Sequence, residues 1–164
     1  MPDEETRKRI VLEYAARMNA GDVDRVLELF ADDIVFEDPV GITPIVGREA
    51  VRHHIAWSIA FKVHETPGRP VCAMDDRQVS LPMVVTVQIP TRLAFRIVSV
   101  IEVGDDDLVH RARAFWGLTD TTVGDGSKPT GVAEFMEVTA SLARLSTERF
   151  GAAGPPPSRN GALP

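Results

Sequence analysis

The hydrophobic period of the chain changes near Pro67, and this change limits the fold more than any other feature of the sequence. Before Pro67, apolar residues recur at the three- and four-residue spacing of amphipathic helices; after it, apolar and β-branched residues partly alternate, as they do in strands. Helices followed by a series of strands are typical of an α+β domain, not of the βαβ order that builds a parallel sheet. We therefore expect a curved antiparallel sheet with the N-terminal helices packed on its concave face.

Three helices are expected before Pro67. The apolar face of the first consists of Ile10, Val11, Tyr14, Ala15 and Met18. Gly21 is placed to end this helix in a left-handed C-cap, and Asp22 can cap a shorter second helix. The apolar face of the second helix consists of Val23, Val26, Leu27 and Phe30. The inward residues of a third helix, which follows Gly47, are Val51, Ile55, Ser58 and Ile59.

Strands are expected at 34–37, 71–74, 79–88, 93–103 and 109–116. Asp38-Pro39 ends the first of them, because proline lacks an N–H group and disfavours helix at the residue before it. We expect residues 1–123 to form one domain, 124–150 an extension with one amphipathic helix, and 151–164 a disordered tail rich in proline and small residues. The apolar residues of the extension helix are Phe135, Met136, Val138, Leu142 and Leu145.

Composition and motifs narrow the function. The net charge of −6 argues against nucleic acid or anionic lipid as the main partner. The single cysteine, Cys72, excludes an intrachain disulfide and a cysteine-based metal cluster. The four histidines, His53, His54, His64 and His110, lack a metal-ligand spacing, and neither a glycine-rich phosphate loop nor a nucleophile elbow is present. No apolar segment approaches the ~20 residues of a membrane span, and the charged start does not resemble a signal peptide. We expect a cytoplasmic protein without a metal or an organic cofactor.

The candidate chemistry is in carboxylates with apolar neighbours. Asp38 ends a strand, and a carboxylate at the rim of an apolar pocket has its pKa raised toward a useful range. Its alternative role is to cap the turn at Pro39. Glu37 must face the opposite side of the strand, because successive side chains alternate. Glu65 follows the third helix, where it either borders the open end of the barrel or is an ordinary surface glutamate.

Two aromatic residues accompany these carboxylates. Tyr14 is the only tyrosine, and it lies on the apolar face of the first helix. A phenol buried there is either a core residue with a satisfied hydroxyl or a hydrogen-bond partner for a ligand oxygen. Trp116, late in the last long strand, fits the wall of a pocket and a plain core position alike.

Several motifs resemble the ketosteroid-isomerase branch of the NTF2-like superfamily. They are Tyr14, Asn19-Ala20-Gly21-Asp22, Ala31-Asp32-Asp33, Glu37-Asp38-Pro39-Val40-Gly41 and Gly47-Arg48-Glu49. The resemblance implies a cone-shaped barrel around an apolar pocket, often in a homodimer, with Tyr14 as oxyanion donor and Asp38 as base. The second oxyanion donor of the isomerases, an aspartate, corresponds to Ser99 here. Further tyrosines of that family correspond to Phe30 and Ile55, which lack a hydroxyl, so steroid isomerisation is disfavoured.

Residues 5–123 are more similar to the polyether epoxide hydrolases/cyclases of the monensin and lasalocid type, which are also NTF2-like. The similarity includes the motif at 37–41 and Phe115-Trp116-Gly117-Leu118-Thr119-Asp120. It also includes a glutamate at the position of Glu65, paired with the aspartate that matches Asp38. The resemblance implies that an epoxide in a polyketide chain is opened to a cyclic ether, with these two carboxylates as acid and base in either order.

On this interpretation, an apolar small molecule is the partner and no cofactor is needed. The side chains expected to shape its site are Tyr14, Trp116, Ser99, Phe30 and Ile55. Three alternatives remain at this point: a pyran-forming dehydratase/cyclase, a ketosteroid-type isomerase and a non-catalytic binding module.

Overall fold

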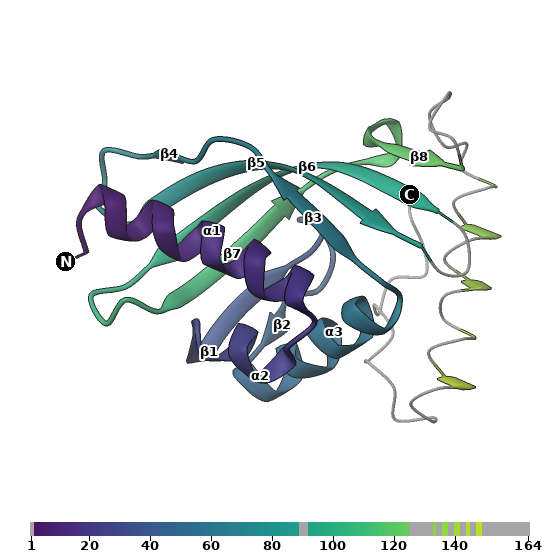
Figure 1. Ribbon diagram of the computed structural model, residues 1–164, viewed down its shortest axis with the longest axis horizontal. Coiled ribbons are helices and arrows are strands. Elements are labelled where there is room, and N and C mark those ends of the chain that lie inside the picture. Colours follow the sequence, from purple (N-terminus) through teal and green to yellow (C-terminus); the bar gives the residue numbers. More distant parts are fainter. Residues whose placement is uncertain are drawn as a thin grey trace.

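The computed structural model describes residues 2–88 and 92–124, together with scattered positions between 133 and 148. Its helices are α1 (Glu4–Ala20), α2 (Val23–Leu27), α3 (Arg48–Ala60) and the 3-10 helix η1 (Leu118–Asp120). Its strands are β1 (Phe30–Glu37), β2 (Ile45–Val46), β3 (His64–Pro67), β4 (Val71–Cys72), β5 (Gln78–Val87), β6 (Leu93–Val103), β7 (Val109–Phe115) and β8 (Thr121–Val123). Figure 1 shows the long strands as one curved layer, with α1 running along it.

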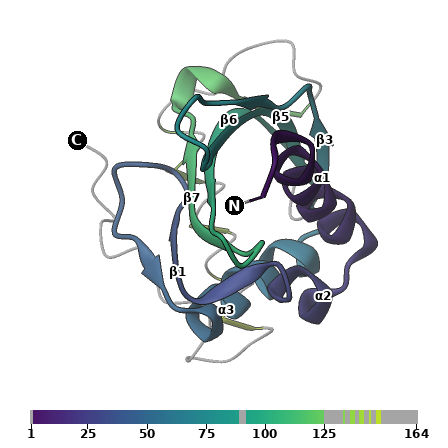
Figure 2. The same cartoon turned by 90° about the vertical axis from the view of Figure 1, so that its left-hand side faces the viewer.

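The described strands form one eight-stranded sheet. Its path runs β2-β1-β7-β6-β5-β3, with β4 paired to β5 and β8 paired to β6. The sheet curves around the helices without closing, because the path does not return from β3 to β2 (Figure 2). The expected α+β fold with a curved sheet is confirmed. One pair, β1 with β7, is parallel, whereas the other pairs are antiparallel. Parallel neighbours need a long connection, and here the chain from α3 to β6 supplies it.

Two local predictions from the sequence are wrong. Phe30 was expected on the second helix, but it begins β1, where it pairs with Val109. The hydrogen bond from the Val109 N–H to the Leu29 carbonyl, 2.8 Å long, adds to this pairing, so sheet formation ends α2 at Leu27. The sequence predicts that residues 63–67 connect the third helix to the sheet, but 64–67 form strand β3, paired with β5. Their polar sequence lacks the apolar alternation that marks a strand.

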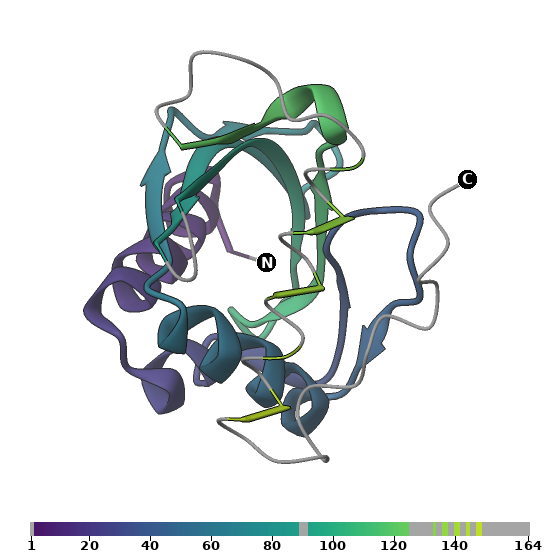
Figure 3. The ribbon, with the colours of Figure 1, turned by 90° about the vertical axis from the view of Figure 1, so that its right-hand side faces the viewer.

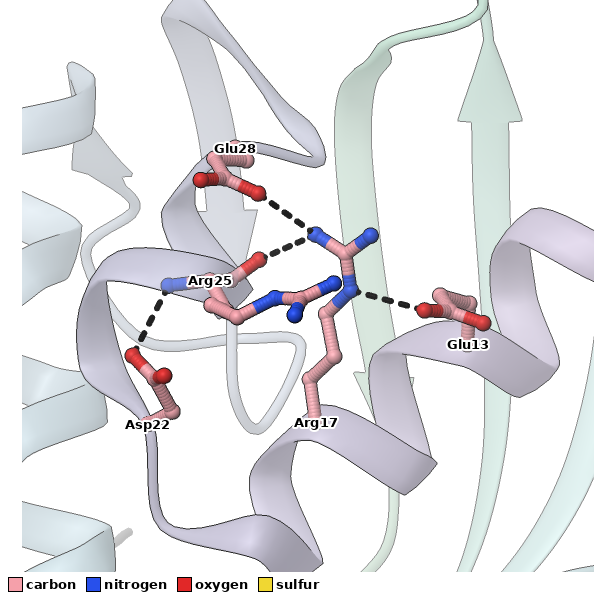
Figure 4. Close-up of polar contacts among 5 residues, drawn as sticks. All are labelled: Glu13, Arg17, Asp22, Arg25 and Glu28. Carbon is pink, nitrogen blue, oxygen red and sulfur yellow. Dashed lines mark hydrogen bonds and ion pairs between the residues drawn. The ribbon is translucent and has the colours of Figure 1, made fainter.

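The corner between α1 and α2 is held by caps and by one arginine. Gly21 ends α1 with φ of 74°, a left-handed conformation that glycine adopts without strain. Asp22 caps α2 by accepting a hydrogen bond from the backbone N–H of Arg25, 3.1 Å long. Arg17 of α1 then donates to Glu13, to Glu28 and to the Arg25 carbonyl, so one guanidinium joins both helices (Figure 4).

The core lies between the helices and the inner face of the sheet. Alternate residues of β5 are buried: Val79, Leu81, Met83, Val85 and Val87. Val11 of α1 and Ile55 of α3 pack in the same core. Helix α3 faces the concave side of the curved strands (Figure 3). Each such side chain contributes about 1.5–3 kcal/mol by its burial. On the outer face, Val84, Val98 and Phe115 are exposed. The expected homodimer stays a prediction.

The expected domain boundary at residue 123 and the two segments beyond it are only partly within the described residues. The scattered positions described between 133 and 148 are helical. The rest of the expected helix at 132–150, and the expected tail at 151–164, lie outside the described residues, so both stay predictions.

Candidate active site

The alternation of β1 turns Asp38 toward the inner face of the sheet. Ile34 and Phe36 are buried, and a residue two positions further along a strand faces the same side. The chain after Asp38 is tied to the sheet by a 2.8 Å hydrogen bond from the Val40 N–H to the Ala114 carbonyl of β7. The Asp38 side chain keeps 25% of its surface exposed. This places a carboxylate at the end of a strand, between the core and solvent.

Each oxygen of Asp38 has a nitrogen nearby. The indole N–H of Trp116, just after β7, donates to Oδ1 over 2.6 Å. Nε2 of His54, on α3, lies 3.6 Å from Oδ2, which is longer than a direct hydrogen bond. Trp116 also packs edge-on against Phe95, with ring centroids 4.9 Å apart. The indole therefore fixes the orientation of the Asp38 carboxylate from a well-packed position.

Glu65 is buried, with only 5% of its surface exposed, although it stands on the edge strand β3. Among the described residues, its Oε2 atom has no hydrogen-bond partner. Burial, followed by the negative charge of Asp38, raises the pKa of Glu65 from 4.5 to about 8. A carboxyl group in this setting holds its proton at neutral pH. Interpreting Glu65 as an ordinary surface glutamate is therefore wrong.

The hydroxyl of Tyr14 belongs to the same electrostatic neighbourhood. Burial raises the pKa of Tyr14 well above its ordinary value, and the charges of Glu65 and Asp38 raise it further. Its ring is 5.8 Å from that of Phe30. A phenol held in its protonated form is a hydrogen-bond donor. The fold thus brings Tyr14, Asp38 and Glu65 into one region from α1, the end of β1 and β3.

The other three expected site residues are parts of the core around this region. Phe30 and Ile55 are fully buried and pack in the main apolar cluster. Ser99 is buried on β6, opposite Leu81 of β5 and Ala114 of β7. Within the described part of the chain, no hydrogen bond joins Ser99 to either carboxylate, so its role at the site stays a prediction.

The sequence predicts that His54 is a partly exposed histidine with no role at the site; 22% of its side chain is exposed, but it lies beside Asp38. The sequence did contain a signal for this inward position. Val51 and Ile55 are on the inward face of α3, and His54 is three residues after Val51 and directly before Ile55. Its ring lies 5.1 Å from that of Phe36, which alternation places on the same side as Asp38. Glu37 behaves as expected, since it faces away from Asp38 and accepts a 2.9 Å hydrogen bond from Arg111.

Two surface hollows lie elsewhere. One, of about 390 Å³, runs along the outer side of α1, and the other, of about 550 Å³, crosses the outer face of β5 and β6. Neither includes Asp38, Glu65 or Tyr14, so the expected interior pocket stays a prediction.

Among the described residues, no group of three or more histidine, cysteine or acidic side chains is placed to hold a metal ion. In the same part of the chain, no helix is long and apolar enough to cross a membrane.

The chain belongs to the SnoaL-like domain family, whose model matches residues 11–112. Among curated proteins it is similar to the epoxide hydrolase LasB of Streptomyces lasalocidi, with 45% identity over 127 residues. That match covers 74% of this chain and 45% of LasB, so the chain spans less than half the length of this relative.

Solved structures agree with this assignment. The epoxide hydrolase/cyclase-like enzyme SalBIII, described as acting in pyran ring formation in polyether salinomycin, has a TM-score of 0.72 and 33% identity. The match covers 75% of this chain and 99% of SalBIII. A computationally designed 17-OHP binder (TM-score 0.68, 23% identity, 73% and 97% coverage) has the same fold. So does RV0760c from Mycobacterium tuberculosis (TM-score 0.69, 22% identity, 76% and 100% coverage). The resemblance to NTF2-like polyether epoxide hydrolases/cyclases is confirmed.

Proposed function

We propose that this chain opens an epoxide in a small-molecule polyketide chain by attack of a hydroxyl group of the same molecule, which gives a cyclic ether. The observation that carries the proposal is the pair of unlike carboxyl groups, one buried at Glu65 and one partly exposed at Asp38. Epoxide opening needs one group that removes a proton and another that supplies one. The similarity to LasB, an epoxide hydrolase, supports this choice of reaction.

In the proposed reaction Glu65 is the acid. Its pKa of about 8 keeps it protonated at neutral pH, and it has no hydrogen-bond partner among the described residues at Oε2. As the epoxide C–O bond breaks, the leaving oxygen takes the proton of Glu65. Protonation of the leaving oxygen contributes about 10²–10⁴-fold to the rate. After this step Glu65 is a carboxylate.

Asp38 is the base. Trp116 occupies Oδ1, which leaves Oδ2 to accept the proton of the attacking hydroxyl. The hydroxyl oxygen forms the new C–O bond as the epoxide bond breaks, so the product is an isomer of the substrate. The next turnover begins when a proton has returned from Asp38 to Glu65. The partial exposure of Asp38 supports this role, because solvent can carry the proton away from Asp38.

Tyr14 and the apolar residues shape the substrate. The phenol of Tyr14 donates a hydrogen bond to the epoxide or to a neighbouring oxygen. Phe30, Ile55 and Ser99 form the surrounding wall. This wall would hold the flexible chain folded, with the hydroxyl close to the epoxide. Holding the two groups in a reactive orientation removes much of the entropic part of the activation barrier of a cyclisation.

A synthetic hydroxy-epoxide with a polyketide-like chain tests the proposal. The parent protein should give a cyclic ether of unchanged mass, and Asp38→Asn and Glu65→Gln should each lower kcat at least about a hundredfold. Ser99→Ala, which removes no proton-transfer group, should change kcat by less than about threefold. A fully active Glu65→Gln variant together with an inactive Ser99→Ala variant would support isomerase-like chemistry instead. Carboxylates that can be replaced without consequence would point to a binding module.

The similarity to SalBIII favours a second candidate, dehydration with closure of a pyran ring. The same acid and base serve this reaction, with Glu65 protonating a leaving hydroxyl instead of an epoxide oxygen. Mass spectrometry of the product separates the two reactions. Epoxide opening leaves the mass unchanged, whereas dehydration removes one water.

A further inference from the structure

The side chain of Asn19 holds the backbone of Glu65 at both of its polar groups. Nδ2 of Asn19 donates to the Glu65 carbonyl over 2.8 Å, and Oδ1 accepts from the Glu65 N–H over 2.7 Å. Both distances are those of well-formed hydrogen bonds. The two residues are 46 positions apart, so these bonds join the end of α1 to strand β3. Asn19 therefore holds β3, the strand that carries the buried carboxyl group of Glu65, by two hydrogen bonds.

The position of β3 in the sheet explains why it needs such a partner. β3 is the last strand of the described sheet path, and it pairs with β5 along one edge only, with Glu65 opposite Val85. In an antiparallel strand, the N–H and C=O of one residue point to the same side. Those of Glu65 point away from β5 and toward Asn19. The asparagine amide thus takes the place of the neighbouring strand that is missing there.

Strand register decides where the Glu65 carboxyl points. A slip of one residue would turn a strand's inward side chains outward. β3 is only four residues long, and the residues that flank Glu65 in it, His64 and Thr66, are polar. The strand therefore has no apolar pattern that would specify its register. The amide of Asn19 recognises one N–H and one C=O of a single residue. With Glu65 in that place, the two bonds hold its backbone so that its side chain faces inward.

Asn19 is itself well held, although it is exposed. Gly21 ends α1 two residues later, and Arg17 ties this last turn of α1 to α2 (Figure 4). Because Asn19 is exposed, water can take over its hydrogen bonds when the side chain is removed. We expect an Asn19 variant to fold, with β3 less closely held.

We propose that Asn19 is a positioning residue for Glu65, which keeps its carboxyl group turned inward beside Asp38 and Tyr14. The inference rests on the proposed function, in which Glu65 is the acid. Asp38 is the charged group that acts on Glu65, and Glu65 and Asp38 in turn act on Tyr14. His64 precedes Glu65 on β3 but is exposed on the other face of the strand.

The test compares Asn19→Ala with the parent protein and with Val103→Ala, a matched control. Val103 is buried at the end of β6. It is far along the strand from Phe95, which pairs with Val85, the partner of Glu65. Three quantities are measured: the kinetic constants on the hydroxy-epoxide, the midpoint of thermal unfolding, and the pH titration of the Glu65 carboxyl carbon by ¹³C NMR. Asn19→Asp keeps the acceptor for the Glu65 N–H but loses the donor to the Glu65 carbonyl. It is tested in case Asn19→Ala does not fold, and its kcat should also fall. Its readout is kcat and not the titration, because its added negative charge itself opposes ionisation of Glu65.

We expect Asn19→Ala to lower kcat about tenfold while KM changes less than about twofold, because orientation of the acid and not binding is lost. The Glu65 titration should move down from about 8 by at least about one pH unit as water reaches the carboxyl group. Val103→Ala should lower the unfolding temperature without either effect. If Asn19→Ala keeps the parental kcat and titration, or behaves like Val103→Ala, the inference is wrong. If the parent does not open the hydroxy-epoxide, the proposed function fails, and the titration alone then decides the role of Asn19.

Discussion

Replacing Glu65 with glutamine should make the protein more stable at neutral pH while removing its activity. Burial and the charge of Asp38 raise the pKa of Glu65 from 4.5 to about 8, so the folded protein binds a proton that the unfolded chain releases. Stability from this group is fully present below about pH 4.5 and is lost as the pH rises through about 8. Glutamine has nearly the shape of the protonated glutamate, and its side chain does not ionise, so its contribution to stability does not change with pH.

The size of the effect follows from the two pKa values. Between about pH 4.5 and about 8, each pH unit lowers the free energy of unfolding by about 1.4 kcal/mol. At pH 7 the accumulated loss is about 3 kcal/mol, and above pH 8 it levels off at about 5 kcal/mol. The free energy of unfolding of Glu65→Gln should lack this decline. The difference between variant and parent should therefore grow with pH.

Urea unfolding of both proteins at pH 5, 6, 7 and 8 measures this difference. Glu5→Gln is a matched control on an 89% exposed side chain, and its effect should stay within about 0.5 kcal/mol at each pH. The amide NH₂ of glutamine has two donor hydrogens where the acid hydroxyl has one, which adds a constant to the difference but leaves its slope unchanged. A difference that does not vary with pH would refute the raised pKa of Glu65, and with it the assignment of Glu65 as the acid.

Four further outcomes are expected. The kcat/KM of the parent should fall about tenfold per pH unit above about pH 8, because Glu65 must carry its proton; a plateau up to pH 10 would contradict this. Trp116→Phe should lower kcat about tenfold through loss of the 2.6 Å hydrogen bond to Asp38, with the unfolding temperature measured alongside to separate packing from catalysis. His54→Gln should lower kcat less than about threefold, since its 3.6 Å contact with Asp38 is too long for a direct hydrogen bond. Tyr14→Phe should lower kcat about tenfold to a hundredfold without changing KM by more than about threefold, and unchanged kcat would show that its hydroxyl does not contact the reacting oxygen.

The fold was largely predictable because its main elements carry strong local patterns. Gly21 and Asp22 marked the end of one helix and the start of the next, and both caps are present. The parallel pairing of β1 with β7 was not predictable, because it joins segments far apart in the chain and neither segment encodes its partner. Strand β3 was also missed. Its sequence is polar, and it is a strand because β5 pairs with it and Asn19 holds its free edge.

The candidate site was predictable in its members but not in their roles. Asp38 and Tyr14 could be selected from their neighbours, and Glu65 from a family resemblance. Which carboxylate is the acid depends on burial, and burial depends on the strand that the sequence did not reveal. The contact between Trp116 and Asp38 likewise joins residues 78 positions apart. Such contacts follow from the tertiary fold alone.

The two carboxyl groups differ because of where the chain places them. Asp38 lies where β1 ends, so it retains access to solvent and receives the Trp116 N–H. Glu65 lies on the inward face of β3, so its carboxyl group is enclosed, and Asp38 then opposes its ionisation. The enclosed acid costs about 3 kcal/mol at pH 7, which is a large share of the 5–15 kcal/mol by which domains are typically stable. A fold selected for stability alone would replace Glu65 with glutamine or an apolar residue. That it keeps a buried glutamate, with an asparagine holding its backbone from outside, is the strongest physical reason to assign the proton-donating step to this residue.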